Sequence, residues 1–140
     1  MATIKALENN RWQLSGEGIS VTYGFSVDDG ITLCEFSVLN ENGNVNYCQK
    51  ESSIVPIVNT DPCCENGRPP FRWNLLSAKF GETVYNKQPV WQLDVEMETL
   101  LYKLTFHAVL FPGVSVVKQW WECENTSVAR TNGFVMQPFC

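Results

Sequence analysis

Hydrophobic and polar residues alternate along most of this chain with the period of two residues that is typical of β-strands. Residues 19–27 show the clearest alternation, in which small residues separate the apolar side chains of Ile19, Val21, Tyr23, Phe25 and Val27. Residues 91–97 also alternate cleanly and predict a strand. Further strands are predicted at residues 11–15, 31–39, 45–48, 54–58, 102–110 and 114–124, and a strand-like tail at 133–140. Residues 71–80 are compatible with a strand or a short helix, and residues 81–89 are expected to form a polar connection.

Turn sequences separate these runs. Asp28-Asp29-Gly30, Asn42-Gly43 and Pro112-Gly113 are typical of hairpins and turns, and the last of them helps to predict a three-stranded antiparallel meander over residues 90–124. No apolar pattern of helical period continues for more than two turns. The predicted fold is therefore all-β: an antiparallel β-sandwich, jelly-roll-like or supersandwich-like, without a long helix. Residues 1–140 are expected to form one such domain, excised from a larger multidomain enzyme.

The charge distribution narrows the range of partners. The chain has a net charge of -5, and its ten lysines and arginines are scattered, so it lacks the basic stripe that nucleic acids and anionic membranes attract. No apolar run approaches the length that spans a bilayer, and the N-terminal residues lack the apolar core of a signal peptide. We expect neither a nucleic-acid nor a membrane partner. Location stays open between a secreted or cell-surface enzyme, which is favoured, and the cytoplasm.

Cysteine and histidine offer little for catalysis or metal binding. Six cysteines are present, and Cys34 and Cys123 fall within strand-like runs, so mostly reduced thiols are expected. Cys63-Cys64 lacks the spacing of a zinc or redox pair. His107 is the only histidine, and it is expected to be structural or simply exposed. No cofactor is predicted. A structural calcium ion is a further alternative, because Asp and Asn residues cluster at 28–29 and 59–66. Their spacing is not specific for calcium ligands.

The strand at 114–124 carries the first candidate binding residues. Alternation places Trp120 on its polar face, two residues from Lys118 and two from Glu122. An indole between charged hydrogen-bonding groups is a common means of holding a sugar ring. The alternative is that a second layer of the protein buries Trp120 as a packing residue.

A proline-containing segment carries the second set. Arg68-Pro-Pro-Phe-Arg-Trp73 combines two guanidinium groups with two aromatic rings, and we expect Arg68, Arg72 and Trp73 to contact carbohydrate. The alternative is that Phe71 and Trp73 anchor this loop to the core while the arginines remain solvated.

The meander also resembles a known family. The run from Trp91 to Thr126 is similar to part of the N-terminal β-supersandwich domain of melibiase-type α-galactosidases and related glycoside hydrolases. In that domain a strand ends in a basic residue, Trp, a variable residue, Glu and then Asn-Thr; the matching residues here are Lys118, Trp120, Glu122, Asn125 and Thr126. In the family a catalytic barrel of about 250 residues follows, for which this sequence has no room. The resemblance implies a noncatalytic accessory domain or carbohydrate-binding module of a glycoside hydrolase.

These observations predict a noncatalytic carbohydrate-binding module for a poly- or oligosaccharide, with a catalytic domain in cis as a further partner. Rows of acids such as Glu122 and Glu124 are expected to be solvated strand faces rather than catalytic pairs. Two alternatives stay open. The first is a structural domain that packs on a glycoside hydrolase barrel. The second is a small β-fold enzyme acting on sugars, which a cleft joining His107 to a carboxylate would favour.

Overall fold

A computed structural model describes residues 2–40, 43–48, 50–55, 57–59, 72–99, 102–125 and 135–137. Strands and turns account for the regular structure of this part of the chain, and it contains no helix. The strands are β1 (Thr3–Leu7), β2 (Arg11–Gly16), β3 (Ile19–Ser26), β4 (Gly30–Asn40), β5 (Gly43–Asn46), β6 (Ser52–Ser53), β7 (Ile57–Asn59), β8 (Asn74–Tyr85), β9 (Gln88–Glu98), β10 (Tyr102–Leu110), β11 (Val117–Asn125) and β12 (Val135–Gln137).

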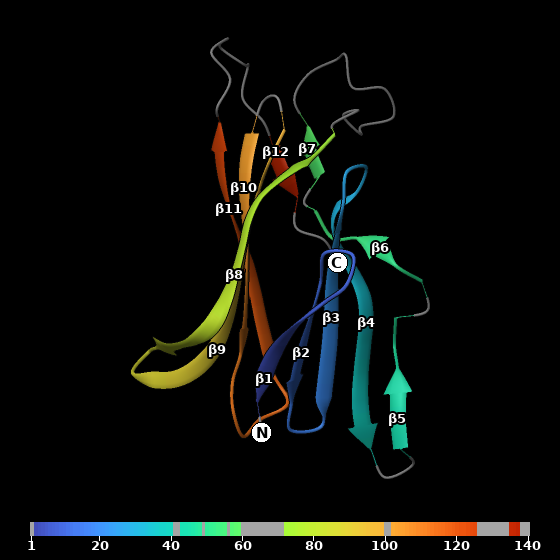
Figure 1. Cartoon of the computed structure of the whole chain (residues 1–140), viewed down its shortest axis with the longest axis vertical. Coiled ribbons are helices and arrows are strands. Elements are labelled where there is room, and N and C mark those ends of the chain that lie inside the picture. The colour runs from blue at the N-terminus through green and yellow to red at the C-terminus, as the bar shows by residue number, and fades with distance from the viewer. Residues whose placement is uncertain are drawn as a thin grey trace.

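Two antiparallel sheets pack together. The six-stranded sheet has the order β1-β2-β3-β4-β5, with β6 also paired to β4, and the four-stranded sheet has the order β11-β10-β9-β8. Strand β1 contacts β9 and strand β2 contacts β10 across the interface between the sheets. A separate pair joins β12 to β7. Figure 1 shows the two main sheets side by side, with β8 and β9 curving outward toward their turn. This arrangement confirms the predicted all-β sandwich.

The meander is confirmed and extended. Strand β10 occupies the predicted residues 102–110, between β9 and β11. The prediction of a polar connection over 81–89 is wrong, because β8 continues to Tyr85 and β9 begins at Gln88. The pattern was weak there because β8 is an edge strand with mostly exposed side chains, so burial does not impose an apolar alternation. The predicted strand at 54–58 is also displaced: β6 ends before it and β7 covers only its last part.

The core lies between the sheets. Every second residue of β10 is completely buried: Tyr102, Leu104, Phe106, Ala108 and Leu110. Phe106 packs edge-on against Tyr23 of the opposite sheet, with ring centroids 4.9 Å apart. Gln119 is the polar residue among Val117, Trp121 and Cys123 on the inner face of β11. The Tyr23 hydroxyl donates a hydrogen bond to Gln119 Oε1 at 2.7 Å, which explains a polar side chain at this position. Burial raises the pKa of the Tyr23 phenol above its ordinary value.

Three of the cysteines lie within the described residues. Cys34, Cys48 and Cys123 are free thiols. Burial raises the pKa of the Cys34 and Cys123 thiols. Cys63, Cys64 and Cys140 lie outside the part of the chain that the structure describes.

Candidate functional site

The side of the four-stranded sheet that faces away from the six-stranded sheet is called the outer face below. Strand register places its residues in rows that cross all four strands. The central row contains Lys79, Asp94, His107 and Trp120. One adjacent row contains Ser77, Glu96, Thr105 and Glu122. The other contains Gly81, Gln92, Val109 and Lys118. Residues distant in sequence therefore form one polar and aromatic surface.

Trp120 lies on this outer face, as alternation predicted. Its indole is half-buried and stacks on the His107 ring, with centroids 4.8 Å apart and planes inclined by 19°. Lys118 Nζ lies 5.7 Å from the centroid of the indole. The packing of Trp120 thus comes from its own sheet face, and the indole keeps a partly exposed surface between Lys118 and Glu122.

The turn end of the β8–β9 hairpin closes one side of this surface. The Tyr85 hydroxyl accepts a hydrogen bond from Lys118 Nζ. The Tyr85 ring centroid lies 6.3 Å from that of Trp120 and 5.7 Å from that of Phe111. Val109, although on the outer face, is completely buried. These contacts show that the hairpin curls over the outer face and adds an aromatic wall beside Trp120.

His107 connects two carboxylates beneath this surface. Its Nδ1 lies 2.5 Å from Asp94 Oδ1, and Gln92 Nε2 donates a second hydrogen bond to the same oxygen at 2.7 Å. Its Nε2 lies 3.2 Å from Glu122 Oε2, but this nitrogen is buried and makes no aligned hydrogen bond. The His107 side chain is only 13% exposed and that of Glu122 is 69% exposed. The imidazole is mostly buried and lies between a carboxylate held by two contacts, Asp94, and a mostly exposed one, Glu122.

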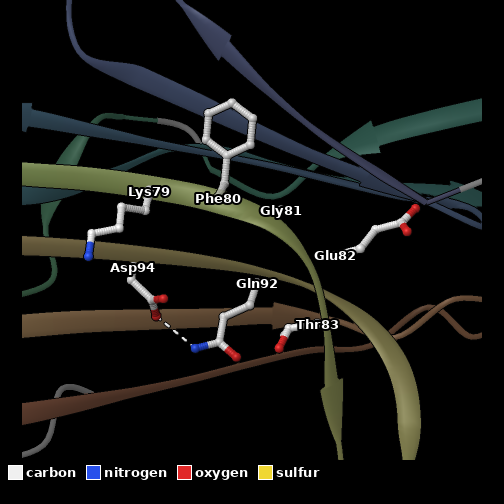
Figure 2. A pocket seen from close by; sticks show the side chains of 7 residues that line it. All are labelled: Lys79, Phe80, Gly81, Glu82, Thr83, Gln92 and Asp94. Atoms are coloured by element: carbon white, nitrogen blue, oxygen red, sulfur yellow. Dashed lines mark hydrogen bonds between the residues drawn. The ribbon is translucent and has the colours of Figure 1, made fainter.

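A depression of about 210 Å³ adjoins Asp94. Its lining residues come from β8 and β9: Lys79, Phe80, Gly81, Glu82, Thr83, Gln92 and Asp94. Figure 2 shows the Gln92–Asp94 hydrogen bond in this depression, beside the β8 ribbon at Gly81. A Cβ atom added at Gly81 would meet no other atom within 4 Å, so there is open space beside this glycine. The depression gives solvent a route toward the carboxylate that holds His107.

A second, larger groove of about 470 Å³ lies at the end of the sheet where the β8–β9 turn meets the loop before β11. It is lined mainly by apolar residues: Gln88, Pro89, Phe111, Pro112, Val114 and Val116. Phe111 belongs to this groove and also contacts Tyr85, so the groove continues the aromatic wall beside Trp120.

The structure brings only some of the predicted binding residues together. Trp120, Lys118 and Glu122 share the outer face, as expected. Trp73 is 5% exposed and belongs to the core, with its backbone N–H bonded to Val27 O at 2.8 Å, so its indole is not a surface for a sugar. Arg72 is exposed, and Arg68 lies outside the described residues. Trp73 is therefore left out of the candidate site, and its position matches the packing alternative.

His107 and Tyr85 belong to the outer face but were not predicted as binding residues. Alternation placed Trp120 on the polar face of its strand, and the same alternation puts Asp94 and His107 on the outer faces of β9 and β10. What the sequence lacked was the register between those strands, because a shift of two residues preserves every face and changes every neighbour.

A different polar cluster lies on the six-stranded sheet. Glu51 accepts hydrogen bonds from Thr32 Oγ1 at 2.8 Å and from Cys34 Sγ at 3.3 Å, and it forms an ion pair with Arg11 at 3.0 Å. The hydrogen bond from Thr32, then that from Cys34, lowers the pKa of the Glu51 carboxyl. These contacts join Glu51, in the segment before β6, to strands β2 and β4.

The described residues contain no group of three or more His, Cys, Asp or Glu side chains arranged to hold a metal ion. Asp28 and Asp29 belong to one of the two clusters from which the sequence left a calcium site open. They lie in the β3–β4 turn, where the Asp29 backbone N–H donates a hydrogen bond to Ser26 Oγ at 3.0 Å. Most of the second calcium segment, 59–66, lies outside the described residues. Within the described chain, no helix is long and apolar enough to cross a membrane.

Comparison with protein-family models, curated proteins and solved structures finds no match to this chain. The resemblance to the N-terminal domain of melibiase-type α-galactosidases therefore stays a prediction.

Proposed function

We propose that this chain is a noncatalytic carbohydrate-binding module that holds a poly- or oligosaccharide on its outer face. The observation that carries this proposal is the position of Trp120, a half-buried indole between Lys118 and Glu122 with Tyr85 at its side. A catalytic domain in cis, of the glycoside hydrolase type that the resemblance implies, is the partner that this function calls for.

The chemistry of the outer face suits a sugar ring. The C–H face of a pyranose is apolar and stacks on an aromatic ring, whereas its hydroxyls need donors and acceptors at the ring edge. Trp120 supplies the aromatic surface. Lys118 can donate to a hydroxyl, and the exposed Glu122 carboxylate can accept from one. Rings held by their neighbours lose little side-chain freedom when a ligand binds, which favours affinity.

The charge of the outer face indicates the class of glycan. Its acidic residues outnumber its lysines. The acidic residues are Asp94, Glu96, Glu98, Glu122 and Glu124, and the lysines are Lys79, Lys103 and Lys118. A polyuronate would bring further negative charge to this surface and would be repelled. We therefore propose a neutral or amino-sugar-containing glycan.

Titration of the protein with neutral, amino-sugar and uronate polysaccharides, followed by tryptophan fluorescence and affinity electrophoresis, tests the proposal. We expect saturable binding of a neutral or amino-sugar glycan. Replacement Trp120→Ala should weaken that binding about tenfold or more, because the stacked apolar surface is lost.

Tyr47→Ala is the matched control. Tyr47 is an exposed aromatic residue beyond β5 on the other sheet, 63% exposed, and its removal should leave binding unchanged. Equal losses in the two variants, or a Trp120→Ala variant that binds as the wild type does, would contradict the proposed site. Circular dichroism of each variant shows whether the β-fold is intact.

The contact of His107 with Asp94 and Glu122 favours a second candidate, a small β-fold enzyme acting on sugars. An imidazole that lies between two carboxylates can accept and donate a proton, as general acid–base catalysis requires. Nuclear magnetic resonance of the bound glycan separates the two candidates. Chemical conversion of the glycan that is lost in Glu122→Gln would favour the enzyme, whereas unchanged glycan would favour the binding module.

A further inference from the structure

We propose that His107 is a positioning residue of the outer face. In its protonated form it bridges Asp94 and Glu122 beneath Trp120, and glycan binding is strongest in this form and weakens when the ring loses a proton. This inference rests on the proposed function for its effect on glycan binding. The coupling of His107 to Trp120 does not depend on that function.

The two ring nitrogens of His107 have different neighbours. Each faces a different carboxylate, Asp94 at Nδ1 and Glu122 at Nε2. An imidazolium carries a proton on both nitrogens and can donate to both carboxylates, whereas a neutral imidazole has only one N–H and leaves the other carboxylate facing a lone pair. The arrangement of acceptors on the two sides of the ring therefore matches the protonated form.

Nε2 is the ring nitrogen whose neighbour can move. Asp94 Oδ1 is held by Nδ1 and also by Gln92 Nε2, so this side of the ring is fixed by two contacts. Nε2 is buried and has no aligned hydrogen bond, and Glu122 is its nearest carboxylate. Because Glu122 is mostly exposed, its side chain is the one free to rotate. Protonated Nε2 attracts Glu122 toward Trp120, and loss of that proton releases it.

The charge of the His107 ring also affects the aromatic surface. Trp120 stacks on the His107 ring at 4.8 Å, and an indole face attracts a cation. A change in the charge of the ring therefore alters the interaction that holds Trp120 in place. Both the proposed stacking platform and its neighbouring acceptor, Glu122, depend on the same proton.

The other charged groups around His107 are placed differently. Glu96 of β9 lies one row away and pairs with Lys103 of β10 at 3.7 Å. Lys118 of β11 bonds to Tyr85. Lys79 of β8 is opposite Asp94, on the far side of that strand from His107. Asp94 and Glu122 are the only charged groups of the described residues at ion-pair distance from the ring.

Because His107 is the only histidine of the chain, its ring signals are unambiguous in a proton–carbon NMR spectrum. We expect the Trp120 indole N–H signal to shift in step with the His107 ring signals as the pH is raised through the range in which those ring signals change. In His107→Gln the Trp120 signal should not change over this range. A Trp120 signal that is insensitive to pH in the wild type, or equally sensitive in His107→Gln, would overturn the proposal.

Glycan affinity gives the second readout. Binding should weaken about three- to tenfold between the pH at which the ring signals report a protonated His107 and the pH at which they report a neutral one, as expected for the loss of a charge-assisted contact. This ratio should approach one in His107→Gln and in Glu122→Gln. It should persist in Glu124→Gln, the matched control, whose carboxylate lies in the next row beside Lys103. A ratio that persists in His107→Gln would overturn the proposal. Failure of every glycan to bind would contradict the proposed function instead, and the NMR titration would still decide whether His107 controls Trp120.

Discussion

At the scale of single residues, buried polar groups explain positions that the apolar pattern alone leaves irregular. Gln119 interrupts an otherwise apolar set on β11, and it does so because its amide oxygen accepts a bond from the buried Tyr23 hydroxyl across the sandwich. This hydrogen bond connects the two sheets directly through side chains. Each partner satisfies a group that would be costly to leave unpaired.

Replacement Gln119→Leu should lower the free energy of unfolding by about 1–3 kcal/mol, because the Tyr23 hydroxyl would remain buried without an acceptor. The double variant Tyr23→Phe, Gln119→Leu should recover part of this loss, since neither polar group is then left unpaired. Urea unfolding of the two single variants and the double variant measures the coupling. Additive effects in this cycle would show that the hydrogen bond contributes nothing specific.

Individual residues also show what sequence reasoning could and could not find. Trp120, Lys118 and Glu122 were placed on one face because alternation within a strand fixes sidedness. The contact between His107 and Glu122 depends on the pairing of β10 with β11, which no pattern within a single strand contains. The prediction for Trp73 differs from the structure for a related reason: an aromatic residue next to prolines and arginines resembles part of a binding loop, and only the folded structure shows that its ring lies in the core.

At the scale of elements, β8 is the least predictable strand. Its side chains are mostly exposed, a register shift lies between Leu75 and Ser77, and its polar second half resembles a connection. The sequence of the turn that follows β8 does not predict its type either. Asn86 and Lys87 both have positive φ, at 49° and 65°, and they join the paired residues Tyr85 and Gln88, which is the geometry of a type I′ hairpin turn. Such turns favour Asn-Gly, whereas this chain has Asn-Lys.

Replacement Lys87→Gly should therefore stabilise the hairpin. Glycine adopts positive φ without the strain that a Cβ atom imposes, and we expect the free energy of unfolding to rise by up to about 1 kcal/mol. Lys87→Ala is the control, because it removes the charge and keeps the Cβ atom, and it should give no gain. Thermal or urea denaturation measures the difference between the two variants. Equal stability of the glycine and alanine variants would show that the turn is not strained.

At the scale of the whole molecule, the two sides of the four-stranded sheet have different roles. The inner side of β9–β11 packs against the six-stranded sheet and forms part of the core, and the outer side carries the charged and aromatic rows. Alternation predicted both the fold class and this division, because each half-buried strand sends one set of side chains inward. It did not predict how far the β8–β9 hairpin curls over the outer face, since that curvature depends on twist and on the contacts of Tyr85 with Lys118 and Trp120.

The most direct measurement of the central claim is a map of the glycan contact surface by proton–nitrogen NMR, recorded as a neutral or amino-sugar oligosaccharide is added. We expect the largest shifts at the Trp120 indole N–H and at the backbone of β10 and β11 around His107, Lys118 and Glu122, with the strands of the six-stranded sheet unaffected. Shifts centred on the six-stranded sheet, or none at saturating oligosaccharide, would contradict the account.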